Sequence, residues 1–107
     1  MKRYTVVFHA EAETDIASSY EWGCRVWGEE RAQAWARELR RVVKLRLTSS
    51  PLSFALAPES EDLGVPIRQH IMHGRYRILF TVEKKTVTIL HLRGPYVGRL
   101  ELDEGQD

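Results

Sequence analysis

The chain has 107 residues, with 16 Lys and Arg against 15 Asp and Glu, which gives a formal net charge of +1. A chain of this length forms one domain with one core, and its near-neutral charge argues against a strongly electropositive nucleic-acid binder. The single Cys24 excludes an internal disulfide, and no CxxC or HExxH spacing indicates a metal site, so we expect neither a metal nor a cofactor. The apolar run from Val6 to Phe8 is too short for a signal peptide or a membrane span, and we therefore expect a cytoplasmic protein.

The first half of the chain predicts one strand and two helices. Residues 3–8, RYTVVF, are β-branched and aromatic, as is typical of a strand. From Ala10 to about Trp27, acidic residues in the first turns and apolar residues at near-helical spacing indicate a helix. A second helix is predicted over residues 29–48, because its apolar positions recur every three or four residues until SSP at 49–51 ends it.

The second half predicts a loop and three strands. Residues 52–66 are rich in Pro, Gly and acids and show no periodicity, which indicates a loop. Strands are predicted over 67–72, 75–83 and 86–93, joined by turns at His73–Gly74 and Lys84–Lys85. The order βααβββ predicts an α+β fold in which a two-helix hairpin packs on one face of a small, mainly antiparallel sheet, with the opposite face open for ligands. We expect a single domain over residues 1–100, followed by an acidic tail over residues 101–107.

The stretch IRQHIMHGRYRILF, at residues 67–80, has an unusual charge pattern for a hairpin. It contains three arginines and two histidines, and no acid occurs between Leu63 and Val82. Alternation places Arg75, Arg77, Leu79 and Thr81 on one face of the middle strand. Such a face predicts an anionic ligand or partner, and the plain alternative is a solvated surface paired with Glu59, Glu61 or Asp62 from the preceding loop.

Several parts of the sequence together resemble one protein family. These are the βααβββ order, the opening YTVVF with an Ala-rich and Asp-bearing helix after it, the SSP after the long helix, and the run IRQHIMHGRYRILFTVEKKTVTILHLRG. Over nearly the whole chain, from Tyr4 to Arg93, they resemble the RelE/ParE family of toxins from bacterial type II toxin–antitoxin systems. The resemblance implies a cognate antitoxin as partner, together with either of two activities. RelE-like members cut mRNA in the ribosomal decoding site, and ParE-like members inhibit DNA gyrase.

The resemblance also implies which residues would act in RNA cleavage. Arg77 is the counterpart of a phosphate-stabilising arginine, and a guanidinium can hold phosphate oxygens in a bidentate fork. Arg68 and His70 occupy the positions of two family lysines, and His70 could exchange protons near neutral pH. Near the last strand, the matching positions are Arg93 and Tyr96. The family pattern is only partly reproduced, because no lysine remains on the first hairpin strand and no glutamate is placed as an evident general base.

Four further residues are candidates for RNA or partner binding. His91 shares the last strand with Arg93, and Arg75 lies in the cationic hairpin. Arg40 and Lys44 belong to the arginine-rich face of the second helix, which would suit an acidic antitoxin segment because complementary charge speeds encounter. Our leading expectation is translation inhibition by ribosome-dependent mRNA cleavage, with Arg68, His70, Arg77 and Arg93 converging on one open face. A gyrase inhibitor and a non-toxic, antitoxin-binding remnant of the family are the alternatives.

Overall fold

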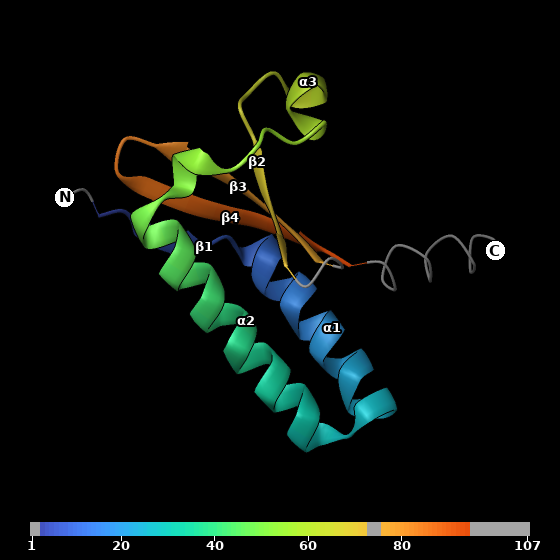
Figure 1. The fold of residues 1–107 in the computed structure, drawn as a ribbon. Helices are drawn as coiled ribbons and strands as arrows, with labels where there is room; N and C mark the ends of the chain where they lie inside the picture. Colours follow the sequence, from blue (N-terminus) through green and yellow to red (C-terminus); the bar gives the residue numbers. More distant parts are fainter. Residues whose placement is uncertain (1–2, 73–75, 95–107) are drawn as a thin grey trace.

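The computed structural model describes residues 3–72 and 76–94, and Figure 1 shows their arrangement. The predicted turn at His73–Gly74, the candidate residues Arg75 and Tyr96, and the acidic tail lie outside the described residues. In chain order the elements are β1 (Thr5–Phe8), α1 (Ala10–Trp27), α2 (Glu29–Ser49), the 3₁₀ helix η1 (Pro51–Ser53), α3 (Glu59–Leu63), β2 (Arg68–Met72), β3 (Tyr76–Glu83) and β4 (Thr86–Arg93). No helix among the described residues is long and apolar enough to cross a membrane.

The two long helices begin and end close to their predicted limits. His9 caps α1, since its ring Nδ1 accepts a hydrogen bond of 3.1 Å from the backbone N–H of Glu11. Acidic residues follow in the first turn of α1, where they interact favourably with the helix dipole. Gly28 alone separates α1 from α2, with φ 99° and ψ 155°, and the two helices therefore form a tight antiparallel hairpin.

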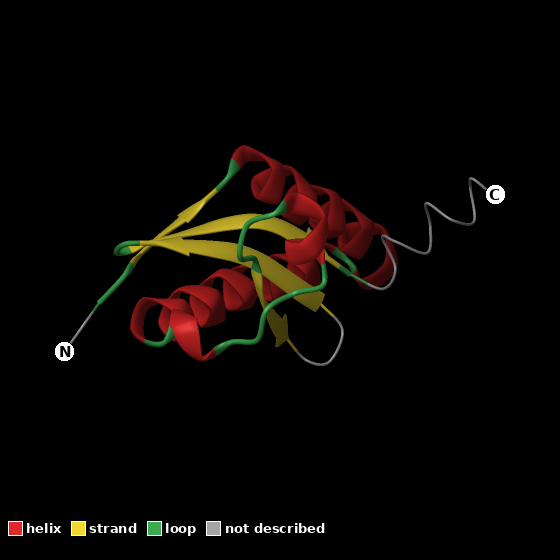
Figure 2. Cartoon of the chain, turned by 90° about the horizontal axis from the view of Figure 1, so that it is seen from above, coloured by secondary structure: helices red, strands yellow, loops and turns green. Residues whose placement is uncertain are grey.

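The four strands form one mixed sheet in the order β1-β4-β3-β2, which Figure 2 shows from above. β4 pairs with β3 and β3 with β2, both antiparallel, whereas β1 lies parallel to β4 with Thr5 opposite Thr86. The register of β3 and β4 shifts between Leu79 and Phe80, where a bulge interrupts the ladder. The predicted α+β class, with a helical hairpin and a mainly antiparallel sheet, is confirmed.

The main core lies between this sheet and the helical hairpin. Phe80 is fully buried at the centre of the sheet, and Leu39, Val43 and Leu47 of α2 are buried within the same cluster. These three α2 residues recur at spacings of four, which places them on one side of a helix with 3.6 residues per turn. The apolar residues whose spacing predicts α2 from the sequence are therefore the residues that α2 contributes to the core.

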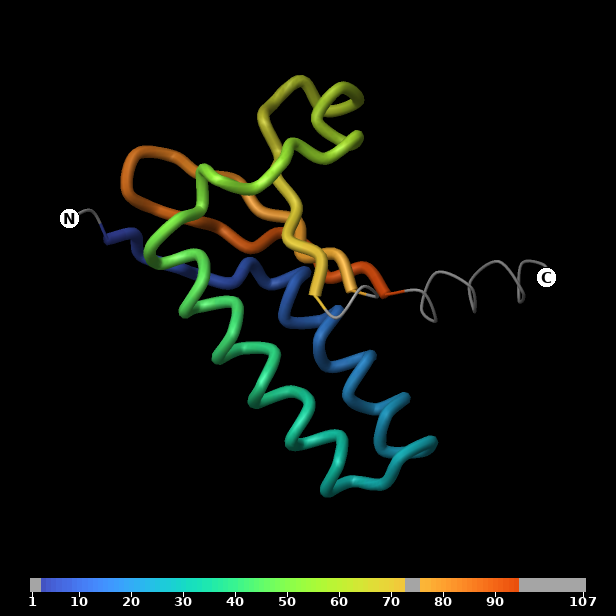
Figure 3. Tube along the Cα trace, in the orientation of Figure 1, coloured from blue at the N-terminus to red at the C-terminus, as the bar shows by residue number. Residues whose placement is uncertain are grey.

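The predicted loop over residues 52–66 is wrong in part, because this segment contains the end of η1 and the five-residue helix α3. Figure 3 traces it from the end of α2 to the start of β2. A backbone hydrogen bond of 2.7 Å from Ala57 N–H to the Ile67 carbonyl holds it, and Ala57, Ile67 and Leu79 form a second buried cluster with Leu90 packed against it. The outer face of the sheet is therefore partly covered, contrary to the expectation that it is open.

Candidate functional site

The cross-strand register divides the predicted site residues between the two faces of the sheet. Residues directly opposite in a ladder share a face. His70 lies opposite Ile78 and Arg68 opposite Phe80, both of which belong to the core side, whereas Arg77 lies opposite Ile71 and Arg93. The expected convergence of all four residues on one open face is therefore wrong, because Arg68 and His70 alternate out of phase with Arg77.

Arg68 and His70 make contacts with Phe54, which follows η1. The Arg68 guanidinium donates a hydrogen bond of 2.7 Å to the Phe54 carbonyl. The His70 ring is 6 % exposed and lies 4.7 Å from the Phe54 ring, centroid to centroid. Burial lowers the pKa of His70, and the nearby charge of Arg46 lowers it further. His70 is thus a neutral residue of the packed interior.

On the outer face, Arg77 is held in a network of hydrogen bonds. Its Nη1 and Nη2 lie 3.2 Å and 2.9 Å from the two carboxylate oxygens of Glu59, and its Nε and Nη2 donate to Gln69 Oε1 at 3.0 Å and 2.8 Å. The hydrogen bonds from Arg77 are the main cause that lowers the pKa of Glu59. The positive charge of Arg93 lowers this pKa further, to a lesser extent. Glu59 is therefore ionised at neutral pH. The Arg77–Glu59 pair corresponds to the alternative interpretation of the sequence, in which the hairpin cations pair with acids of the preceding loop.

Glu59 also resolves an electrostatic conflict in the sheet. Arg77 and Arg93 are direct cross-strand partners, and like charges in this position are destabilising. From the sequence, Glu59 is one of three acids expected as surface partners of the hairpin, and no general base is evident. Glu59 is 18 residues from Arg77 in the chain and lies on a helix that the sequence does not predict.

His91, on β4, is positioned by carboxylates from α1. Its Nδ1 lies 3.1 Å from Asp15 Oδ2, and its Nε2 lies 3.1 Å from Glu11 Oε1. Asp15 Oδ2 also accepts a hydrogen bond of 3.0 Å from the backbone N–H of Leu92, so Asp15 ties α1 to β4 and orients the imidazole. In the sequence these acids indicate only the start of a helix, and nothing there connects them with His91, which lies 76 positions after Asp15.

A hollow of about 300 Å³ lies on this outer face, beside α3 and the start of α1. It brings together ionisable side chains that the sequence separates widely. Its lining is His9, Glu11, Glu59, Leu63, Ile67, Leu79, Leu90, His91 and Arg93. Among the described residues no group of three or more His, Cys, Asp or Glu could hold a metal ion. The hollow therefore combines carboxylates, imidazoles and the guanidinium of Arg93, which are groups that can transfer protons and bind an anion.

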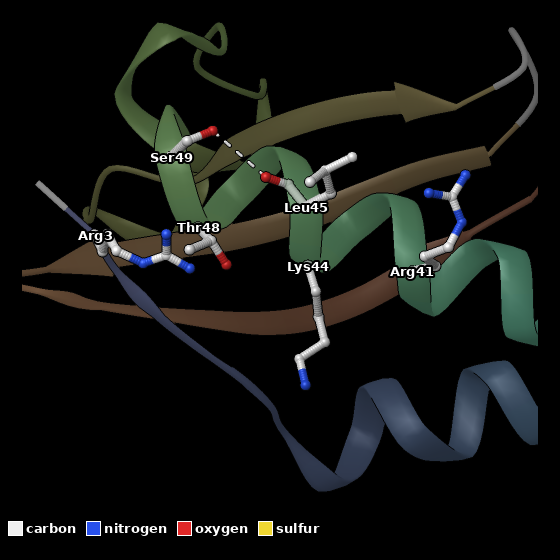
Figure 4. Close-up of a pocket in the computed structure, with 6 residues that line it drawn as sticks. All are labelled: Arg3, Arg41, Lys44, Leu45, Thr48 and Ser49. Carbon is white, nitrogen blue, oxygen red and sulfur yellow. Dashed lines mark hydrogen bonds between the residues drawn. The ribbon is translucent and has the colours of Figure 1, made fainter. Parts of the chain in front are cut away.

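The candidate cations of α2 differ from one another in their surroundings. Arg40 pairs with Glu13 of α1, with 2.6 Å between Nη2 and Oε1, and its guanidinium lies 5.2 Å from the centre of the Phe8 ring. This pair lowers the pKa of Glu13 through the Arg40 hydrogen bond. Lys44 instead lines a second hollow, of about 420 Å³, with Arg3, Arg41, Leu45, Thr48 and Ser49 (Figure 4). Arg40 thus joins the two helices and β1, whereas Lys44 makes no ion pair with any residue that the structure describes.

Comparison with known proteins identifies the fold. The sequence matches no protein-family model and no curated protein. Among solved structures, the chain is similar to one described as "Chromosomal ParDE TA system from P. aeruginosa", with a TM-score of 0.71 and 19 % sequence identity. The similarity covers 86 % of this chain and 96 % of that chain. The chain therefore has a RelE/ParE-like fold, as the sequence predicts.

Proposed function

We propose that the protein is the toxin of a type II toxin–antitoxin pair and that it is held inactive by its antitoxin. The observation that carries this proposal is the likeness to a chain of a ParDE toxin–antitoxin structure over 86 % of this chain and nearly the whole of the other. The sequence resemblance to RelE/ParE toxins supports it independently, since it rests on the order of elements and on motifs in the hairpin. A fold by itself does not choose a target, and the activity has to be argued from the site.

For the activity, the outer-face hollow supports cleavage of mRNA at the ribosome. Cleavage by the 2′-hydroxyl needs a group that takes its proton, a group that protonates the leaving 5′-oxygen, and cations around the phosphate. Glu59 is ionised and is proposed as the base, while His91, which lies 3.1 Å from carboxylates of Glu11 and Asp15, is proposed as the acid. Arg77 and Arg93 would stabilise the phosphate, whose bond to the 2′-oxygen forms as its bond to the 5′-oxygen breaks. Arg68 and His70 have no part in this arrangement.

One observation favours inhibition of gyrase as a second candidate. All three guanidinium nitrogens of Arg77 already donate to Glu59 or Gln69. In cleavage, a phosphate would have to displace Glu59 from Arg77, whereas a toxin that acts by binding a protein target can leave this pair intact. The two candidates differ in whether the pair must open.

The test is to induce the chain alone in growing bacteria and to follow labelled methionine and labelled thymidine during the first minutes. For mRNA cleavage, we expect methionine incorporation to stop while DNA synthesis continues. A prior loss of thymidine incorporation would support gyrase as the target, and no effect on either would indicate a non-toxic member of the family.

Variants then test the proposed roles on purified ribosomes programmed with mRNA. We expect Glu59→Gln and His91→Ala each to slow cleavage by about 100-fold or more, the usual range for loss of a general acid or base. We expect Arg77→Ala to abolish it. The matched control is Glu61→Gln, on the same helix but outside the hollow, which should cleave at the wild-type rate. Wild-type cleavage by Glu59→Gln would refute the role of Glu59 as base.

A further inference from the structure

His9 lies between β1 and α1, where hydrogen bonds hold both its backbone and its ring. The backbone N–H of His9 donates a hydrogen bond of 2.8 Å to the carbonyl of Ile89 in β4, the strand that also contains His91 and Arg93. The ring Nδ1 accepts the capping hydrogen bond of 3.1 Å from the backbone N–H of Glu11. His9 is therefore fixed against both the sheet and the first helix, and its side chain lines the outer-face hollow.

The capping hydrogen bond also decides which ring nitrogen of His9 carries the proton. In a neutral imidazole one nitrogen is a donor and the other is an acceptor. Since Nδ1 accepts from the N–H of Glu11, the proton lies on Nε2. This Nε2 has no hydrogen-bond partner among the described residues. His9 therefore brings to the hollow an N–H donor whose tautomer is fixed and whose hydrogen bond is still to be made.

The carboxylates of the hollow already have partners, and Arg93 does not. The carboxylate contacts are Glu59 with Arg77 at 2.9 Å and Glu11 with His91 at 3.1 Å. Arg93 makes no ion pair or hydrogen bond with a residue that the structure describes. Within the described lining, the polar groups left over are thus two donors, the Nε2–H of His9 and the guanidinium of Arg93. An anion would supply acceptors to both, and hydrogen bonds to a charged acceptor are the strong ones.

The remaining lining of the hollow is apolar, which bears on the size of the ligand. It consists of Leu63, Ile67, Leu79 and Leu90. A bare phosphate would leave these side chains uncovered, whereas the sugar and base attached to a nucleotide phosphate would cover part of them. The hollow, of about 300 Å³, therefore fits a phosphate that is part of a nucleotide better than a free anion.

From these contacts, we propose that His9 and Arg93 form a phosphate-binding subsite. The Nε2–H of His9 and the guanidinium of Arg93 donate to oxygens of one RNA phosphodiester. Binding at these two donors does not require the Arg77–Glu59 pair to open, so capture of the phosphate is a separate step from any displacement of Glu59. The inference deepens the proposed function and rests on it only for RNA as the natural source of the phosphate.

NMR titration of the full chain with a 2′-O-methyl RNA trinucleotide tests the subsite, because this probe lacks the attacking hydroxyl and cannot be cleaved. We expect saturable shifts of the His9 ring signals. The same trinucleotide with uncharged methylphosphonate linkages should bind at least tenfold more weakly, and so should inorganic phosphate.

Two variants and a matched control assign the binding to these donors. His9→Asn keeps a capping oxygen for α1 but has no donor at the position of Nε2, so it should bind the charged trinucleotide about tenfold more weakly with an unchanged urea midpoint. Arg93→Gln should bind it at least tenfold more weakly. The control, Arg25→Gln, removes an exposed positive charge from the last turn of α1 and should bind like the wild type.

Absence of saturable binding, or equal affinity of His9→Asn and Arg25→Gln for the charged trinucleotide, would overturn the proposal. Equal affinity of the wild type for the charged and uncharged trinucleotides would also overturn it, and equal affinity for inorganic phosphate would overturn the assignment to RNA. The incorporation experiment keeps the two proposals apart. A chain that harms no cell would refute the toxin assignment and leave these affinities unchanged, whereas a toxic chain whose His9→Asn variant binds like the wild type would refute the subsite alone.

Discussion

At the scale of single residues, His70 shows how burial connects stability to pH. Its Nε2 is buried with no hydrogen-bond partner among the described residues, and its pKa lies below the ordinary value of 6.5. As pH falls below 6.5, the unfolded chain takes up a proton at this residue before the folded chain does. The stability that the neutral ring confers is therefore full above pH 6.5 and is lost progressively as pH falls toward the lowered pKa of the folded protein.

We expect His70→Leu to stabilise the protein, because it removes the unpaired nitrogen and the titrating group while keeping an apolar contact with Phe54. The gain in the free energy of unfolding should be about 1 kcal/mol at pH 7.5 and should be larger at pH 5.5. Urea unfolding at both pH values measures it. Ile71→Leu, at an exposed position of the same strand, is the control and should retain the wild-type pH dependence. A parallel loss of stability on acidification in His70→Leu and wild type would contradict the expectation.

At the scale of elements, a helix or strand can be predicted from the sequence when it is long enough for its pattern of apolar residues to repeat. α1 and α2 were predictable because each contains several helical turns with one apolar side, and the strands because their side chains alternate. α3 spans five residues, too few to show a period, and Glu59 went unrecognised as a functional residue with it. The sequence also does not show which residues of β2 and β3 share a face of the sheet. Both strands contain ionisable residues, and only the pairing register decides which of them lie on the same side.

The joint between α1 and α2 makes a prediction at this scale. Gly28 has φ 99° and ψ 155°, a conformation that essentially only glycine adopts, while a Cβ built there meets no atom within 4 Å. We therefore expect Gly28→Ala to lower the free energy of unfolding by about 1–3 kcal/mol through backbone strain alone.

Gly64, which ends α3 at φ 73° and ψ 15°, offers the control for this experiment. Asn adopts this left-handed region, so Gly64→Asn should cost less than about 1 kcal/mol. Urea unfolding of both variants provides the comparison. If Gly28→Ala lowers the free energy of unfolding no more than Gly64→Asn does, a side chain at position 28 causes no backbone strain. This result would contradict the expectation.

At the scale of the whole molecule, the helical hairpin is longer than the sheet that it covers. Figure 1 shows the joined ends of α1 and α2 extending well beyond the strands. In this distal part Trp27 of α1 packs against Trp35 of α2, with 6.5 Å between ring centroids, and within α1 it makes an edge contact with Trp22 at 5.5 Å. The main core lies at the other end, between the helical hairpin and the middle of the sheet.

This unequal packing predicts unequal protection from hydrogen exchange. Backbone amides of β3, which has a paired strand on each side and contains the fully buried Phe80, should exchange slowest. Amides in the distal hairpin, over residues 20–32, should exchange through smaller openings and faster. Exchange followed by NMR or mass spectrometry at pH 7 measures both sets, and greater protection in the distal hairpin than in β3 would contradict the expectation.

The parallel pairing of β1 with β4 also has a consequence for how the protein is made. Among the described strands β1 is synthesised first, yet β4, the strand it pairs with, is the last of them to leave the ribosome. β4 also carries His91 and Arg93, so the same late strand completes both the sheet and the proposed site. A nascent chain without β4 contains the helical hairpin but no finished sheet and no finished site. The ribosome that synthesises this protein would therefore not be exposed to its proposed activity until β4 has emerged and folded.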